Sequence, residues 1–199
     1  MSGTVISYDV GMARWEPNAR GRLERAALEL FLERGFEQTT VAEIARRAGL
    51  TERTFFRHFA DKREVLFPGG GALQELLVQA VAAAPDSTTP IDAVAAALQA
   101  AAPWFQERGD YPRQRQAVIA SNPELQEREL IKLAALAAAI AGALRQRGVP
   151  EPAASLAAEA GIAVFKIAFD RWVSSTGQPD LTHLIQDSLD ELKAVTAGN

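Results

Sequence analysis

Apolar residues recur along this chain at intervals of three and four positions, the spacing of a helix that buries one face. The first clear stripe comprises Leu23, Ala26, Ala27, Leu30 and Phe31. Gly35 follows this stripe, and glycine is common just beyond the end of a helix. The alternation of apolar and polar residues that marks half-buried strands is nearly absent, so the pattern predicts an all-α protein.

Capping residues indicate where the next two helices begin. Thr40 and Glu43 have the spacing of a capping box, which predicts a short second helix. Thr51 is placed to cap a short third helix, and Gly49 lies in the turn between the two. Two short helices joined by a tight glycine turn indicate a helix-turn-helix.

The remaining elements follow from the same signals. Asp61 is expected to cap a fourth helix that breaks at Pro68–Gly71, a segment that could be a hinge or a simple loop, and resumes over about 72–84. Later helices are predicted over 90–107, from 112, and over 123–147, 151–175 and 181–195, which makes nine to ten in all. The resulting division is a flexible leader (1–16), a helix-turn-helix domain (17–67, with its motif at 40–59) and a C-terminal domain (68–199).

Composition excludes several classes of function. The chain has 199 residues, of which 48% are hydrophobic and 23% charged, as in an ordinary folded protein. It has no cysteine, which excludes thiolate metal sites and cysteine nucleophiles and fits a cytoplasmic location. No apolar run reaches the roughly 18 residues of a membrane span. No phosphate-binding loop, nucleophile elbow or metal-binding histidine pair is present, so we expect neither an enzyme nor a bound cofactor.

Charge is distributed unevenly along the chain. The net charge of the whole protein is −4, which gives no sign of a nucleic-acid partner. Residues 66–199 have a net charge of −5, whereas residues 40–63 have a net charge of +3. The basic surplus is therefore confined to the predicted helix-turn-helix, as expected for a surface that binds DNA.

The third helix has two different faces when its residues are placed at 100° intervals. Phe55 and Phe59 fall on one side and can pack in a core. The opposite side carries Arg53, Thr54, Arg57 and His58. Arginine can donate two hydrogen bonds to guanine, and threonine can contact a base edge or a thymine methyl group, so this face suits a major groove.

Four spaced segments carry a resemblance to a known family: residues 23–36, 39–45, 49–59 and the pair Asp61-Lys62. In this order the segments resemble the DNA-binding domain of the TetR family of bacterial transcriptional regulators. The resemblance implies that Thr40 and Lys62 contact phosphates. It also implies that Arg57 and His58 lie on or beside phosphates, and that the start of the third helix faces the bases through Thr51, Glu52, Arg53 and Thr54.

Two positions of the third helix call for separate comment. The family usually has tyrosine where this chain has Phe56, which can make only apolar contact because it lacks the phosphate-binding hydroxyl. Glu52 can accept a hydrogen bond from cytosine, or it can simply stabilise the helix N-terminus. Four residues that precede or open the first helix belong either to a basic arm for the minor groove or to a frayed terminus: Arg14, Trp15, Arg20 and Arg22.

The C-terminal half contains two apolar stripes that could join two copies of the chain. One stripe comprises Ile162, Phe165, Phe169 and Trp172, and the other comprises Leu181, Leu184, Ile185, Leu189 and Leu192. Four-helix packing across a two-fold axis is what the family resemblance implies for these helices. Ordinary core packing within one chain is the alternative.

A second set of residues could line a pocket for a small molecule. This set is Trp104, Phe105, Tyr111, Phe165, Lys166, Phe169 and Trp172. A helical stripe of aromatic residues is more often core than ligand site, and Lys166 could either pair with Asp170 or bind an acidic effector.

Together these features predict a sequence-specific transcriptional regulator that binds double-stranded DNA. In this interpretation a homodimeric repressor of a palindromic operator is released by an unidentified small-molecule effector, with no membrane involved. The alternatives are a ligand-responsive activator or global regulator of the same fold, and a protein-interaction module that has lost DNA binding.

Overall fold

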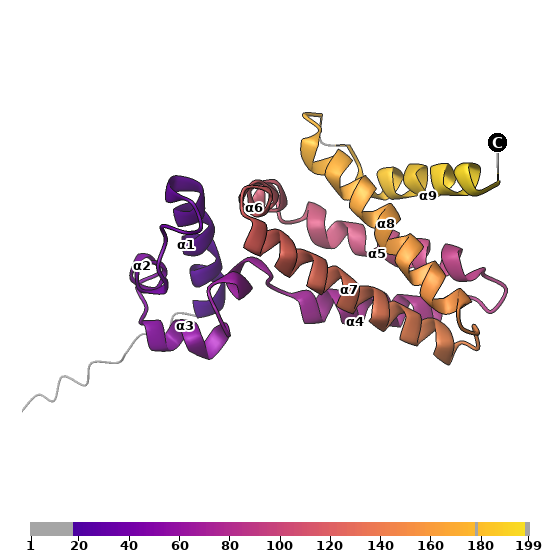
Figure 1. The fold of residues 1–199 in the computed structure, drawn as a ribbon, viewed down its shortest axis with the longest axis horizontal. Helices are drawn as coiled ribbons and strands as arrows, with labels where there is room; N and C mark the ends of the chain where they lie inside the picture. The colour runs from indigo at the N-terminus through magenta and orange to yellow at the C-terminus, as the bar shows by residue number, and fades with distance from the viewer. Residues whose placement is uncertain (1–17, 178, 198–199) are drawn as a thin grey trace, which may run out of the picture.

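A computed structural model describes residues 18–177 and 179–197 of the chain (Figure 1). Within these ranges the protein is all-helical and has no strand, so the predicted fold class is confirmed. The elements are α1 (Ala19–Arg34), α2 (Val41–Arg47), α3 (Glu52–His58), the 3₁₀ helix η1 (Arg63–Leu66), α4 (Gly70–Ala83), α5 (Pro90–Gln106), α6 (Tyr111–Ala120), α7 (Pro123–Gln146), α8 (Ala153–Ser174) and α9 (Leu181–Ala197). The predicted leader, 1–16, lies outside the described residues, together with Arg14 and Trp15.

Side-chain caps start the helices where the sequence predicts. Thr40 and Glu43 form the complete capping box of α2, and the Thr51 hydroxyl accepts the N–H of Thr54 at the start of α3. Asn122 caps α7 in the same way, with its side-chain oxygen accepting the N–H of Leu125. Each cap satisfies a backbone donor that has no partner inside the helix.

The segment after α3 differs from the prediction of a helix that begins at Asp61. The Asp61 carboxylate accepts the N–H groups of Arg63 and Glu64, but the turn that it caps is the short 3₁₀ helix η1. The predicted break is present, because Gly69 has a φ of +73° immediately before α4. A side chain at Gly69 would also meet the Trp104 ring, with Cβ 2.9 Å from Cζ2.

Two hydrophobic cores organise the chain. Phe55 of α3 is fully buried under α1, and its ring centroid lies 5.2 Å from that of Phe59. This first core also takes in Val118, Ile119 and Leu125, which belong to α6 and the start of α7. The unit formed by α1–α3 and η1, here called the head, therefore packs directly on α6 and the start of α7.

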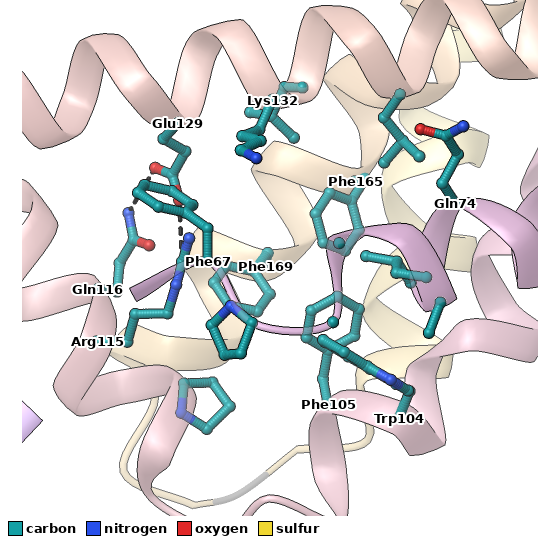
Figure 2. Close-up of a pocket in the computed structure, with 18 of the residues that line it drawn as sticks. Phe67, Gln74, Trp104, Phe105, Arg115, Gln116, Glu129, Lys132, Phe165 and Phe169 are labelled. Carbon is teal, nitrogen blue, oxygen red and sulfur yellow. Dashed lines mark hydrogen bonds and ion pairs between the residues drawn. The ribbon is translucent and has the colours of Figure 1, made fainter. Parts of the chain in front are cut away.

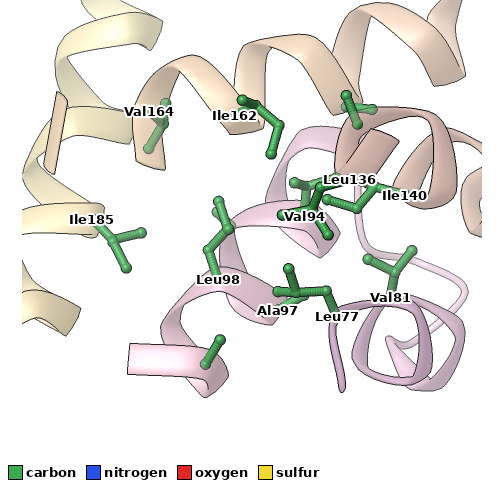
Figure 3. Packing of buried hydrophobic residues seen from close by; sticks show 14 of the residues in the cluster. Leu77, Val81, Val94, Ala97, Leu98, Leu136, Ile140, Ile162, Val164 and Ile185 are labelled. Atoms are coloured by element: carbon green, nitrogen blue, oxygen red, sulfur yellow. The ribbon is translucent and has the colours of Figure 1, made fainter. Parts of the chain in front are cut away.

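The second core lies among α4, α5, α7, α8 and α9, here called the bundle (Figures 1 and 3). Its fully buried side chains include Val94 of α5, Ile140 of α7 and Ile185 of α9. α8 crosses close to α5, because Gly161 allows the two backbones to approach around Val94. Burial of these apolar faces is the main source of the bundle's stability.

The stripe residues predicted for a dimer interface lie inside this core. Ile162, Leu181, Leu184, Ile185 and Leu189 are all buried within the single chain, and Leu192 is half-buried against the same cluster. Within the single chain α8 and α9 turn these five side chains toward each other and toward α5, and their predicted contact with a second copy stays a prediction. The alternative of core packing is the observed one.

Candidate functional site

The outward face of α3 presents a compact group of polar and basic side chains. Thr51, Glu52, Arg53 and Arg57 are exposed, and Thr54 is half-buried beside them. Phe56 is also outside, 54% exposed, with its ring centroid 5.5 Å from that of the buried Phe55. The predicted division of the helix into a buried aromatic side and an exposed polar side is therefore present.

His58 is an exception on this helix. It is half-buried, and its Nε2 is enclosed without a hydrogen-bond partner among the described residues. The ring lies 6.4 Å, between centroids, from that of Phe59. His58 thus sits at the margin between the core and the exposed face, so its predicted place beside a phosphate stays a prediction.

The threonines that cap α2 and α3 use their side-chain hydroxyls for hydrogen bonds within their own helices. The Thr40 hydroxyl donates to the Glu43 carboxylate at 2.9 Å and accepts the Glu43 N–H at 3.2 Å. The Thr40 N–H and hydroxyl lower the pKa of Glu43, so the carboxylate is charged at neutral pH. A phosphate that took the Thr40 hydroxyl would have to displace this carboxylate.

Only part of the basic surplus is available to a partner. Arg47 donates to Glu33 through two bonds of 3.0 Å and 2.9 Å. Arg63 bonds Asp61 at 2.6 Å and lies 3.2 Å from Glu124 at the start of α7. Four cations among residues 40–63 make no ion pair with another described residue: Arg46, Arg53, Arg57 and Lys62.

Lys62 holds the head together. Its Nζ donates to the carbonyl oxygens of Phe36 at 2.8 Å and Thr39 at 3.0 Å, and it lies 4.0 Å from the centroid of the Phe36 ring. An ammonium group has three donors, so one remains for the phosphate contact that the resemblance implies.

A cavity of about 810 Å³ lies where the head meets the bundle. Its aromatic wall comes from the ends of α5 and α8 (Figure 2). The Phe105 ring centroid lies 5.4 Å from those of both Phe165 and Phe169, and 4.7 Å from that of Trp104. This size and lining suit a small organic molecule.

The structure places most of the predicted pocket residues on this cavity. Trp104, Phe105, Tyr111, Phe165, Lys166 and Phe169 all line it. Trp172 is not among the lining residues, because its ring packs behind Phe169 and near the guanidinium of Arg113. The predicted ion pair between Lys166 and Asp170 does not form in the described chain, although both residues border the cavity.

The wall of the cavity opposite the aromatic residues is polar, and no sequence pattern predicts it. Arg115 of α6 donates to Glu129 of α7 at 3.0 Å, and Gln116 approaches the same carboxylate at 3.5 Å (Figure 2). Lys132 of α7 donates to Glu64 of η1 at 2.9 Å. The partners are far apart in sequence, so no local pattern indicates these pairs.

Two polar atoms at the cavity lack partners. The Tyr111 hydroxyl and the Gln116 Oε1 are buried without a hydrogen bond among the described residues. Burial raises the pKa of Tyr111 to about 12, so the phenol is neutral and able to donate at physiological pH. A buried donor without a partner is costly, and a ligand could satisfy it.

Direct contacts join the polar wall to the head. Arg115 donates through Nε to the carbonyl oxygen of Leu66 at 2.6 Å, and Asn122 donates to Glu37 at 3.0 Å. Arg128 bonds the same Glu64 that Lys132 reaches. Burial would raise the pKa of Glu64, but the hydrogen bonds from Lys132 and Arg128 outweigh it and lower this pKa.

Two other features are absent from the described residues. They contain no group of three or more histidine or acidic residues that could hold a metal ion. None of the helices in the described ranges is long and apolar enough to cross a membrane.

The architecture defines a class of protein, in which a helix-turn-helix head is packed on a helical bundle with a cavity at the junction. Residues 24–67 match the family described as bacterial regulatory proteins, tetR family, and residues 88–197 match the MftR C-terminal domain. Because the second match alone covers more than half of the chain, the chain belongs to the TetR family of bacterial regulatory proteins.

Individual relatives agree with this assignment. The regulator TcmR of Streptomyces glaucescens is 43% identical over 81 residues, which are 41% of this chain and 36% of TcmR. The regulator MftR of Mycobacterium tuberculosis is 37% identical over 102 residues, half of each chain. The chain thus matches half or less of each relative's length. The crystal structure of FadR from Bacillus subtilis with stearoyl-CoA has a TM-score of 0.61 at 21% identity, covering 86% of this chain and 96% of FadR, and shows the shared fold.

Proposed function

We propose that this protein is a sequence-specific transcriptional repressor that a small molecule releases from DNA. The observation that carries the proposal is the outward face of α3, where Arg53 and Arg57 are exposed and make no ion pair among the described residues. Such a face fits a major groove, where arginine can read guanine bidentately. Family membership supports the same conclusion, since TcmR and MftR are both named as transcriptional regulators.

The proposal divides the work between two parts of the chain. Residues 17–67 bind DNA through their motif at 40–59, and residues 68–199 bind the effector and a second copy of the chain. The cavity between head and bundle is the effector site, because its aromatic wall and unpartnered polar atoms suit a bound organic molecule. The protein acts by binding rather than catalysis, and it acts in the cytoplasm.

DNA recognition is tested by selecting bound sequences from a random pool and measuring affinity for the selected operator. Arg53→Ala should cost about 1–3 kcal/mol and relax preference at one base pair of each half-site. Arg57→Ala should weaken binding to all sequences to a similar degree. It should also reduce the slope of log affinity against log salt concentration by about one, the effect of losing one phosphate contact. Arg145, exposed near the end of α7 where it pairs with Glu151, gives the control, and Arg145→Ala should bind as the unmodified protein does. Failure to enrich any sequence would refute the proposal.

The dimer is proposed to form through the outward face of α8. Leu156, Ala160, Ala163 and Ile167 follow each other at intervals of four, three and four along this helix, and Leu156 and Ile167 are 66% and 57% exposed. This spacing gives one continuous apolar stripe that a second copy can cover about a two-fold axis.

Light scattering after size-exclusion chromatography tests this interface. The unmodified chain should be a dimer at micromolar concentration, and Ile167→Asp should be a monomer, because a buried aspartate pair would be both desolvated and repulsive. Leu32→Asp on α1 is the matched control, since Leu32 is also exposed but lies in the head. If the Ile167→Asp variant is still a dimer, the interface does not include this face of α8.

A further inference from the structure

One ion pair connects the cavity to the head. Lys132 projects from α7 toward the space between Phe67 and Phe165 (Figure 2), and its Nζ donates to Glu64 at 2.9 Å. Glu64 belongs to η1, which follows directly after the helix-turn-helix. Both residues line the cavity. A molecule in the cavity can therefore reach a contact that holds the head on the bundle.

The cavity has an excess of positive charge. Its lining contains the cations Arg20, Arg108, Arg115, Lys132 and Lys166 but only the carboxylates Glu64, Glu129 and Asp170. Lys166 makes no ion pair in the described ranges, and its charge adds to that of Lys132. An anionic group in the cavity would be favoured by this excess, because interactions between charges strengthen where water is partly excluded.

We propose that the effector is an apolar molecule bearing one anionic oxygen group, and that this group takes Lys132 away from Glu64. The release of DNA that would follow rests on the proposed function. The apolar body lies against Phe105, Phe165 and Phe169, and the anionic group lies at the polar wall. Loss of the Lys132–Glu64 bond loosens η1, and with it the head, from α7.

The exchange leaves no charge unpaired. Glu64 keeps its bonds to Arg128 when Lys132 turns to the ligand, so the partly buried carboxylate still has a cationic partner. The Tyr111 hydroxyl, which has no partner among the described residues, can donate a further hydrogen bond to the ligand's anionic oxygen. A neutral apolar molecule would fill the same aromatic wall but would leave the Lys132–Glu64 bond intact.

A matched pair of fluorescent probes tests the ligand class. 1-Anilinonaphthalene-8-sulfonate carries an anionic group, and N-phenyl-1-naphthylamine has the same aromatic body without it. The unmodified protein should bind the sulfonate about tenfold more tightly or better, which is the effect of one charge-assisted contact. Lys132→Met should abolish this preference and leave the neutral probe within about twofold, while Lys132→Arg should retain most of it.

Lys193 provides the control for removal of a lysine that forms an ion pair. It bonds Asp92 at 2.7 Å on the bundle surface, and it does not line the cavity. Lys193→Met should keep the preference for the sulfonate. Equal binding of both probes by the unmodified protein, or an equal loss in Lys193→Met, would overturn the ligand class.

Glu64→Gln tests the competition between ligand and head. Removing the carboxylate frees Lys132, so sulfonate affinity should rise several-fold, and unchanged affinity would overturn this step. With DNA, the sulfonate should weaken operator binding by the unmodified protein more than by Glu64→Gln, because binding linkage is reciprocal. If no operator is found, the proposed function fails and the probe results still decide the ligand class. If an operator is bound but the probes are not distinguished, the ligand class alone fails.

Discussion

Two glycines in the interiors of bundle helices differ in the space around them, and this difference predicts opposite effects of one substitution. A Cβ on Gly161 of α8 would overlap Cγ1 of Val94 and lie 3.4 Å from its Cβ. Val94 is fully buried and β-branched, so it has little freedom to move. A Cβ on Gly142 of α7 would meet only the Arg145 guanidinium, at 3.7 Å.

The expected magnitudes follow from two terms. Alanine is favoured over glycine inside a helix by about 1 kcal/mol, and this gain applies to both positions. Overpacking of a filled core costs about 1–3 kcal/mol and applies only to Gly161. Gly142→Ala should therefore raise the free energy of unfolding by about 0.5–1 kcal/mol, whereas Gly161→Ala should lower it by up to about 2 kcal/mol. In a chain of this size the corresponding shifts in Tm are about 2–4 °C per kcal/mol.

Urea denaturation followed by far-ultraviolet circular dichroism measures both changes, with equal m values as a check that the unfolding transition is the same. Val94→Ala supplies the internal control, because it removes the methyl groups that a Cβ on Gly161 would meet. In that background Gly161→Ala should become stabilising by about 1 kcal/mol. The reasoning is refuted if Gly161→Ala stabilises the unmodified protein as much as Gly142→Ala does.

Three further substitutions test the site. Phe56→Tyr should strengthen operator binding about tenfold by adding a hydroxyl that can donate to a phosphate, and fluorescence anisotropy showing no gain would count against the predicted orientation of α3. Tyr111→Phe removes a buried hydroxyl without a partner among the described residues, so the urea midpoint should rise by an amount equivalent to about 1 kcal/mol, while a fall would show that the hydroxyl is satisfied. Because the pKa of Glu64 is lowered in the folded protein, its stabilising effect is complete above the ordinary pKa of 4.5 and is lost as pH falls through the lower folded value. Urea titrations at several pH values should show less acid destabilisation in Glu64→Gln, and equal acid sensitivity would contradict the role of this ion pair.

The parts of the fold that could be predicted from the sequence depend on short-range interactions. Thr40, Thr51 and Asn122 cap helices through residues three positions away, so their patterns are visible in any window of the sequence. The inward side of α3 follows from the spacing of Phe55 and Phe59. The sequence predicts an α-helix from Asp61 where the structure has the 3₁₀ helix η1, because an aspartate caps both kinds of turn in the same way.

The polar wall of the cavity could not be predicted, because its pairs join distant parts of the chain. Glu64 and Lys132 are 68 residues apart, and Arg115 reaches the carbonyl oxygen of Leu66 across 49 residues. Each of these side chains looks like an ordinary surface residue in its own helix. Only the packing of α6 and α7 on the head brings them together.

The burial of the predicted dimer stripe within one chain has a physical explanation, which also supports the proposed position of the interface. An apolar stripe at helical spacing shows that a face is buried, but it does not show what buries it. On α8 the larger stripe, which includes Ile162 and Phe169, is covered by the chain's own α5, α7 and α9. Once this face is covered, the fold of a single chain does not require apolar residues on the outer side of α8. The second, weaker stripe from Leu156 to Ile167 is therefore the part of α8 that folding of a single chain leaves unexplained, and the proposed dimer would cover it.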